Sequence, residues 1–216
     1  MLTFDSHIHS SYSLDSIFHP KFIIKLAKLK GLGAIAVTDH DTILGGIKTQ
    51  LHANSNLLVI TGCEVKTEFG DLIGLFLNEE LRSRKFEEVV DEIRDQGGLA
   101  VLPHPYRRKI LPPETLLKKV DLIEGFNGRT SVELNQKGLM LAKSLGKPAI
   151  AGSDAHIPYE VGLATTIFYD IQYIDQEMLR KCILRDNMGL SFARPLPALD
   201  KVSAICGYAI KKARSI

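Results

Sequence analysis

The chain has 216 residues, a hydrophobic fraction of 45%, a charged fraction of 24% and a formal net charge of +2. These values exclude a disordered chain, a fibrous repeat and a strongly basic nucleic-acid scaffold, and they suit one α/β domain over 1–216. Because no apolar run reaches the roughly 20 residues that span a bilayer and no signal pattern opens the chain, we expect a cytoplasmic protein without a membrane partner.

Strands and helices are predicted to alternate over the first half of the chain. Pro20 and Gly31 are ordinary boundary residues for the first helix. A hairpin then interrupts the alternation, because two apolar strands flank the Phe69-Gly70-Asp71 turn. In chain order the expected elements are strand 2–4, helix 20–30, strand 34–38, helix 43–53, and the hairpin strands 57–60 and 72–76.

The same alternation continues in the second half. Gly97-Gly98 ends the next helix, and apolar strands follow it at regular intervals. The expected elements are helix 86–96, strand 99–102, a short helix 115–119, strand 121–126, helix 132–145, strands 148–151 and 165–169, and helices 175–185 and 199–214.

Near-continuous apolar strands in about seven strand–helix units predict a parallel sheet closed into a barrel. The polar motifs support closure, because we expect each of them at a strand end, on the rim where barrel enzymes assemble their sites. An open flavodoxin-like sheet would gather ligands mainly at one crevice. The fold prediction is therefore an α/β barrel with its site at the carboxyl ends of the strands.

Five of the seven histidines lie in short motifs that are rich in carboxylates. Neutral imidazole and ionised carboxylate are the ligands that divalent Zn²⁺, Mn²⁺ and Fe²⁺ accept in proteins. His7 and His9 flank one residue, so on an extended chain both rings face the same side. The motifs are Asp5-Ser6-His7-Ile8-His9, Thr38-Asp39-His40-Asp41, Pro103-His104-Pro105 and Gly152-Ser153-Asp154-Ala155-His156.

These motifs, with Glu64 between them, resemble in order, spacing and strand-end placement the PHP (polymerase and histidinol phosphatase) domain family. The resemblance covers essentially the whole chain. It implies a distorted seven-stranded βα barrel, two or three divalent metal ions (Mn, Fe or Zn) and hydrolysis of phosphoesters.

The resemblance also implies roles for single residues. It places His7, His9, Glu64 and Asp154 around a first metal, with Glu64 bridging to a second. His104 belongs to that second ion. The implied ligands of a third position are Asp15, His40 and His156.

Two positions depart from the family pattern. Asn127 stands where fully trinuclear members have a histidine, which weakens the second position, and we expect it beside the substrate. Asp15 replaces a histidine of some relatives and should favour harder ions such as Mn²⁺. The alternative for Asp15 is a loop carboxylate that caps the helix after Pro20.

Other polar residues near the motifs have competing interpretations. Asp39 is interpreted as an acceptor that fixes the tautomer of His40, and Asp41 as the N-cap of the following helix. Arg107 and Arg129 follow strand ends and are expected to clamp phosphate, because a guanidinium matches phosphate oxygens bidentately. Residues for which a structural or surface role is expected are Arg108, Lys109, His19, His52, Tyr106, Tyr159, and the reduced thiols Cys63, Cys182 and Cys206.

The expected function is a metal-dependent phosphoesterase that hydrolyses phosphomonoesters of nucleotides or similar small metabolites with metal-activated water. His156 or His40 could protonate the leaving group. Histidinol phosphate is the alternative substrate, and a non-catalytic metal-binding module and hydrolysis at carbon are the competing classes. The expected partner is a small phosphorylated substrate, with no stable nucleic-acid complex and the oligomeric state open.

Overall fold

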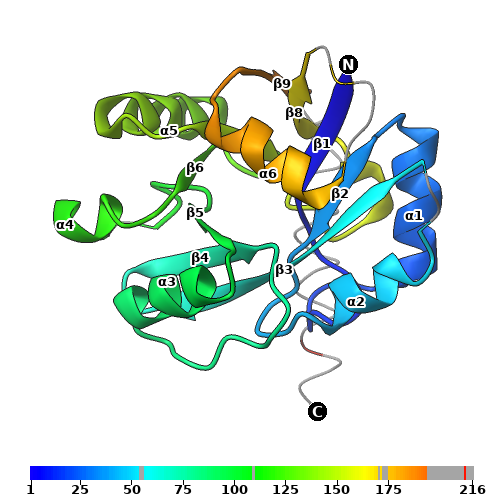
Figure 1. The fold of residues 1–216 in the computed structure, drawn as a ribbon, viewed down its shortest axis with the longest axis horizontal. Helices are drawn as coiled ribbons and strands as arrows, with labels where there is room; N and C mark the ends of the chain where they lie inside the picture. Colours follow the sequence, from blue (N-terminus) through cyan, green and yellow to red (C-terminus); the bar gives the residue numbers. More distant parts are fainter. Residues whose placement is uncertain (54–55, 109, 170, 172–174, 194–211, 213–216) are drawn as a thin grey trace.

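A computed structural model describes residues 1–53, 56–108, 110–169, 171, 175–193 and 212, and all statements below concern that part (Figure 1). Its strands are β1 (Leu2–Ile8), β2 (Ala34–Val37), β3 (Leu58–Thr67), β4 (Gly70–Leu75), β5 (Leu99–Leu102), β6 (Leu122–Asn127), β7 (Ala149–Gly152), β8 (Ala164–Phe168) and β9 (Met188–Phe192). Its helices are α1 (Pro20–Leu29), α2 (Leu44–Gln50), α3 (Phe86–Asp95), α4 (Glu114–Leu117), α5 (Val132–Leu145), α6 (Gln176–Leu184) and the 3₁₀ turn η1 (Pro158–Glu160). Of the described helices, none combines the length and apolar character needed to cross a bilayer.

The strands form a nearly closed barrel, as predicted. They pair in the order β7-β6-β5-β4-β3-β2-β1-β8-β9, and β4 runs antiparallel to both of its neighbours. The ring closes where the chain after β7 meets β1: the amide of Asp154 donates to the carbonyl of His7 at 2.7 Å, and the amide of His9 donates to the carbonyl of Ala155 at 2.9 Å. β8 and β9 extend the sheet beyond β1 in antiparallel pairing.

The barrel interior below the rim is an apolar core. Alternate residues of the strands point inward, and α6 contributes Leu179 and Ile183 to the same cluster. Other helices cover the outside of the sheet: Val89, Val90 and Ile93 of α3 belong to a second apolar cluster, separate from the interior one. The inward-facing strand residues include Phe4, Ala34, Ala36, Ile60, Ile73, Leu75, Leu99, Val101, Leu122 and Ile150.

Three local predictions need correction. β3 does not end before Glu64 but runs through it to Thr67, because the hairpin with β4 continues the ladder. α2 begins after Ile43 rather than at a cap by Asp41, whose φ of 61° directs the chain away from the helix and whose side chain pairs with Arg84. The pattern also gave no sign of β9, and the predicted helix 199–214 lies outside the described residues apart from residue 212.

Gly152 lies at the closure of the barrel, where no side chain fits. A Cβ atom there would lie 2.4 Å from the Cβ of His7 and 2.7 Å from Oε1 of Glu124. We therefore expect Gly152→Ala to lower the free energy of unfolding by about 1–3 kcal/mol, because β7 would have to move away from β1. Urea denaturation measures this effect, and an unchanged midpoint would contradict a tight closure.

Candidate metal centre

Four side chains converge on one point at the carboxyl end of β1. The Nε2 atoms of His7 and His9 lie 3.0 Å apart, and Oε2 of Glu64 lies 3.4 and 3.3 Å from them. Oδ1 of Asp154 lies 3.6 and 3.4 Å from the same two nitrogens. Ligands about 2.0–2.1 Å from a tetrahedral ion are roughly 3.3 Å apart, so this donor set fits one divalent metal.

A second group shares Glu64. The other oxygen of this carboxylate, Oε1, lies 3.0 Å from Nε2 of His104, and donor atoms of Glu64, Asp71 and His104 all lie within 4.8 Å of one another. Asp71 comes from β4, so the hairpin brings a carboxylate to the barrel rim. His104 is held at a φ of 30°, a left-handed conformation that is strained for a residue with a side chain.

Asn127 lies at the carboxyl end of β6, and its side chain is engaged by neighbouring residues of the site. It is fully buried, its amide nitrogen donates to Glu124 and Asp154, and its oxygen accepts from Arg107 and Arg129. With its amide used in this way, the structure gives no support to the expected contact between Asn127 and substrate. The carboxylate of Asp71, rather than the amide of Asn127, completes the group around His104.

A third group lies on the other side of His9. The carboxylate of Asp15 bridges His40 and His156, with 3.4 Å from one oxygen to Nε2 of His40 and 3.4 Å from the other to Nε2 of His156. Among described atoms Oδ1 of Asp15 is a buried oxygen that accepts no hydrogen bond, as expected of an atom reserved for a cation. The helix cap considered for Asp15 is instead made by His19.

Glu124 forms hydrogen bonds that hold one histidine in each of the first two groups. Its Oε1 accepts from Nδ1 of His7 at 3.0 Å, and its Oε2 accepts from the amide of His104 at 2.7 Å. When Nδ1 of His7 donates its proton to Glu124, the lone pair of Nε2 is free and points toward the other donors. This is the usual arrangement of a metal-bound histidine. Glu124 was not among the residues predicted from the sequence, although a carboxylate inside an apolar strand is a usable signal.

Asp39 acts on His9 rather than on His40. It accepts from the hydroxyls of Ser10 and Ser13 at 2.6 and 2.7 Å. Because Ser13 gives its proton to Asp39, its oxygen accepts from Nδ1 of His9 at 3.1 Å and from the amide of His40 at 3.0 Å. The predicted tautomer-fixing contact therefore exists, but it runs through a serine and holds a different histidine.

The buried carboxylates of the site require positive charge close to them. Burial lowers the pKa of His9, but Asp154 and Glu64 outweigh it and raise this pKa to about 9. Burial would raise the pKa of Glu64, yet His7 and His104 hold it well below its usual value. In the protein alone the histidines balance the buried carboxylates by holding protons, and divalent ions are the natural replacement for those protons.

Both predicted phosphate-binding arginines face the central cavity. This cavity has a volume of about 340 Å³ and is lined by Asp15, His40, Glu64, Asp71, His104, Arg107, Arg129, Asp154 and His156. Nη1 of Arg107 lies 2.8 Å from Asp154, and Nη1 of Arg129 lies 2.7 Å from Nδ1 of His156. The cavity thus joins metal-type donors to two guanidinium groups.

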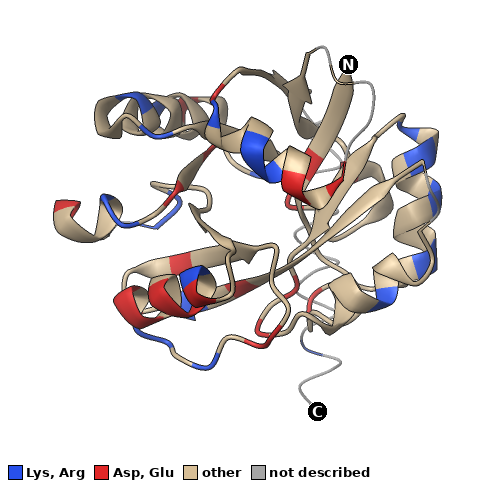
Figure 2. Cartoon of the chain, in the orientation of Figure 1, with Lys and Arg blue, Asp and Glu red and all other residues tan. Residues whose placement is uncertain are grey.

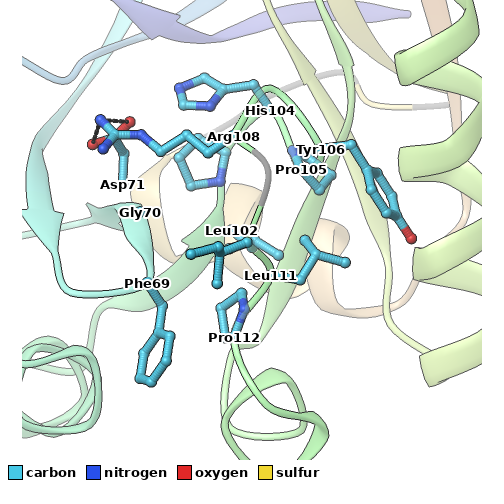
Figure 3. A pocket seen from close by; sticks show the side chains of 12 residues that line it. Phe69, Gly70, Asp71, Leu102, His104, Pro105, Tyr106, Arg108, Leu111 and Pro112 are labelled. Atoms are coloured by element: carbon cyan, nitrogen blue, oxygen red, sulfur yellow. Dashed lines mark hydrogen bonds and ion pairs between the residues drawn. The ribbon is translucent and has the colours of Figure 1, made fainter.

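A narrow groove lies beside the cavity, between the β3–β4 turn and the loop after β5 (Figure 3). Asp71 and His104 belong to both spaces. Arg108 extends to Asp71 with contacts of 2.8 and 2.9 Å, so it is an ion-paired residue rather than a free surface arginine. The walls are mostly apolar: Phe69, Leu102, Pro103, Pro105, Ile110, Leu111 and Pro112.

Lys109 and Cys206 lie outside the described residues, and the other residues with structural expectations lie outside the central cavity. His19 caps α1, and its ring lies 6.1 Å from that of His52. Cys63 is buried, and burial raises the pKa of its thiol, which suits an inert core residue. Tyr106 lines the groove, and neither it nor Tyr159 lines the cavity.

A nearly closed α/β barrel with histidine and carboxylate clusters at one rim defines the class of metal-binding barrel proteins. Sequence comparison agrees: the model of the PHP domain matches residues 5–97, and that of a PHP-associated region matches residues 132–186. The uncharacterized protein MJ1587 of Methanocaldococcus jannaschii is 40% identical over 137 residues, which is 57% of this chain and 80% of the relative. The chain belongs to the PHP domain family.

Solved structures with low sequence identity show the same fold. A two-domain protein of Bacteroides vulgatus that contains a predicted PHP-like metal-dependent phosphoesterase matches with a TM-score of 0.77 and 20% identity over 89% of this chain and 65% of its own. An amidohydrolase of Chromobacterium violaceum with bound sulfate and no metal matches with a TM-score of 0.63 and 20% identity over 91% of this chain and 99% of its own.

Metal binding should release protons. The pKa of His9 is about 9 in the protein alone, so this ring is protonated at pH 7.5, whereas a metal ligand must be neutral. We expect Zn²⁺ or Mn²⁺ to displace about one proton or more per protein molecule, with affinity falling as pH falls. Titration with a pH indicator in weak buffer measures the release. Binding without proton release would contradict the proposed involvement of His9.

Glu124→Gln should weaken metal binding without unfolding the barrel. The amide cannot accept from both His7 and His104 with the strength of a carboxylate, and loss of such a support costs about 10- to 100-fold in metal affinity. Calorimetric titration measures this effect. The matched control is Glu133→Gln, an exposed carboxylate of α5 paired with Lys137. If Glu124→Gln and Glu133→Gln bind metal with equal affinity, Glu124 does not support the metal ligands.

Proposed function

We propose that the protein is a metal-dependent phosphoesterase that hydrolyses phosphomonoesters of nucleotides or similar small phosphorylated metabolites. One observation carries this proposal: metal-type donors and two arginines line the same cavity. Divalent ions alone would suit several hydrolases. The pairing with two guanidinium groups favours a substrate that carries a compact double negative charge.

The donor groups fit a centre of two or three ions. The two oxygens of Glu64 point to different histidine groups, so this carboxylate would hold two ions close together. When bound, such ions supply an activated water and neutralise charge that develops on phosphorus oxygens. The ligands of the first position would be His7, His9, Glu64 and Asp154, those of the second Glu64, Asp71 and His104, and those of the third Asp15, His40 and His156.

Arg129 is placed to receive a phosphate oxygen. Its Nη1 lies 2.7 Å from Nδ1 of His156, which is also 2.8 Å from the carbonyl of Asp154. One ring nitrogen cannot donate to the carbonyl and accept from the guanidinium at once. If the ring donates to the carbonyl, this arm of Arg129 needs another acceptor, and a phosphate oxygen supplies one.

His156 and His40 are the candidates for the acid that protonates the leaving group. Burial, and then the charge of His9, lowers the pKa of His156, so the neutral ring is favoured there. The side chain of His40 is 38% exposed, in contrast to 6% for His156, which leaves His40 more open to an entering substrate. When the third position holds no ion, we favour His40 of the two as the proton donor. His156 then remains paired with Asp15.

The groove beside the cavity has a volume of only about 20 Å³, so a leaving group would lie in the cavity of about 340 Å³ rather than in the groove. The groove begins at Asp71 and His104 and continues between proline and leucine side chains. Hydrolysis at carbon is less favoured, because none of the described residues that line the cavity is a lysine that could serve as a carboxylated metal ligand. A non-catalytic module is also less favoured, because all three donor groups are complete in this chain.

Metal-loaded protein should release phosphate from at least one small monoester. The experiment loads the protein with Mn²⁺, Fe²⁺ or Zn²⁺ and supplies nucleoside mono- and bisphosphates, histidinol phosphate and a chromogenic aryl phosphate. A chelator should abolish the release. Stoichiometric metal with no release from any of these esters would favour the non-catalytic module and contradict the proposal.

Arg129→Met should lower kcat/KM by about 100-fold, the usual effect of removing one donor to a developing oxyanion. The control is Arg84→Met, an exposed arginine outside the cavity that pairs with Asp41. Steady-state phosphate release with the best ester measures both variants. Similar losses in the two proteins would exclude a specific contact between Arg129 and phosphate.

A further inference from the structure

The outer arc of α1 carries lysines and large apolar side chains together. Pro20, Ile23, Ile24 and Ala27 face the barrel and are buried. At 100° per residue the opposite arc holds the exposed residues 21, 22, 25, 28 and 29. Two of these are apolar and remain in solvent: Phe22 is 43% exposed and Leu29 is 73% exposed.

The neighbouring helix α2 presents an apolar stripe to solvent. Leu44, Ile47, Lys48 and Leu51 follow the i, i+3, i+4, i+7 spacing of one helix face. Leu44 is 46% exposed, Ile47 36% and Leu51 72%. A stripe of this spacing normally packs against a core, and when exposed it marks an interaction surface.

The lysines of this face have no acidic partners. Lys21, Lys25, Lys28, Lys30 and Lys48 form no ion pair with any described residue, and neither helix contains an Asp or Glu. Elsewhere Lys85, Lys118, Lys119, Lys137 and Lys181 all pair with glutamates. In Figure 2, α1 and α2 accordingly show blue without red, whereas α3 is mainly red.

We propose that the outer face of α1 and α2, defined by Lys21, Phe22, Lys25, Lys28, Leu29, Leu44, Ile47, Lys48 and Leu51, docks on an anionic lipid bilayer. Lysines attract the headgroups, and the apolar side chains among them enter the boundary between headgroups and acyl chains. This is a peripheral contact, so the lack of a spanning helix does not oppose it, although it goes beyond our expectation of no membrane partner.

Other occupants fit this face less well. A nucleic acid would be bound by arginines and stacking aromatic rings, whereas the exposed apolar residues here are mostly aliphatic and neither helix has an arginine. A second copy packed symmetrically on the same face would bring the lysine rows together, which is repulsive. The central cavity and the groove involve no residue of either helix, so the face is separate from the proposed catalytic site.

Cosedimentation with vesicles tests the proposal. We expect the protein to bind vesicles of phosphatidylcholine mixed with phosphatidylglycerol, to bind pure phosphatidylcholine weakly, and to be released by added salt. Lys21→Glu/Lys25→Glu/Lys28→Glu should weaken binding to the anionic vesicles by at least about tenfold. Leu51→Ser should also weaken it, because an apolar contact is lost.

The control variant is Lys118→Glu/Lys137→Glu/Lys181→Glu, which changes the net charge equally on other faces. It should retain most of the vesicle binding, and phosphate release should be unchanged in all variants if they are folded. Equal losses in the two triple variants, or no vesicle binding, would overturn the proposal. So would binding to single-stranded RNA in place of vesicles, or a dimer that Leu51→Ser dissociates.

Discussion

The carboxylate of Glu64 is the group on which the arrangement of the site depends. It is buried inside the barrel, and its two oxygens lie within 3.0 to 3.4 Å of ring nitrogens of His7, His9, His40 and His104. A buried charge of this kind is tolerated only when opposite charge surrounds it. The rims of β1, β2 and β5 therefore have to converge on the middle of β3, and the hairpin that lengthens β3 places Glu64 at the required depth.

The same requirement explains the layers of polar residues below the rim. Glu124 and Asp39 do not face the cavity, yet each fixes a ring that does, directly for His7 and through Ser13 for His9. Rigid placement of donors matters because an ion tolerates little error in distance. An apolar core fills the barrel directly beneath, so the polar groups have few alternatives to the contacts that they make.

Much of the fold and of the candidate site could be predicted from the sequence, for identifiable reasons. Strand periodicity and histidine motifs are local signals, so the barrel, its rim and the convergence of His7, His9, His40, His104, Asp154 and His156 could be anticipated. Asp71 could not, because its role depends on hairpin register and it lies in a turn pattern that usually has no function. Asp41 was misplaced because Arg84, a side-chain partner distant in sequence, decides where its carboxylate points.

The barrel closes through the same residues that carry the candidate ligands. The amide of Asp154 donates to the carbonyl of His7, so the first strand of the chain and a segment almost 150 residues later are joined at one place. An ion bound by the side chains of His7 and Asp154 would stabilise this contact between the two segments. The free energy of unfolding would then rise with the free metal concentration. If the site binds metal, the fraction of folded protein would therefore depend on the free metal concentration around it.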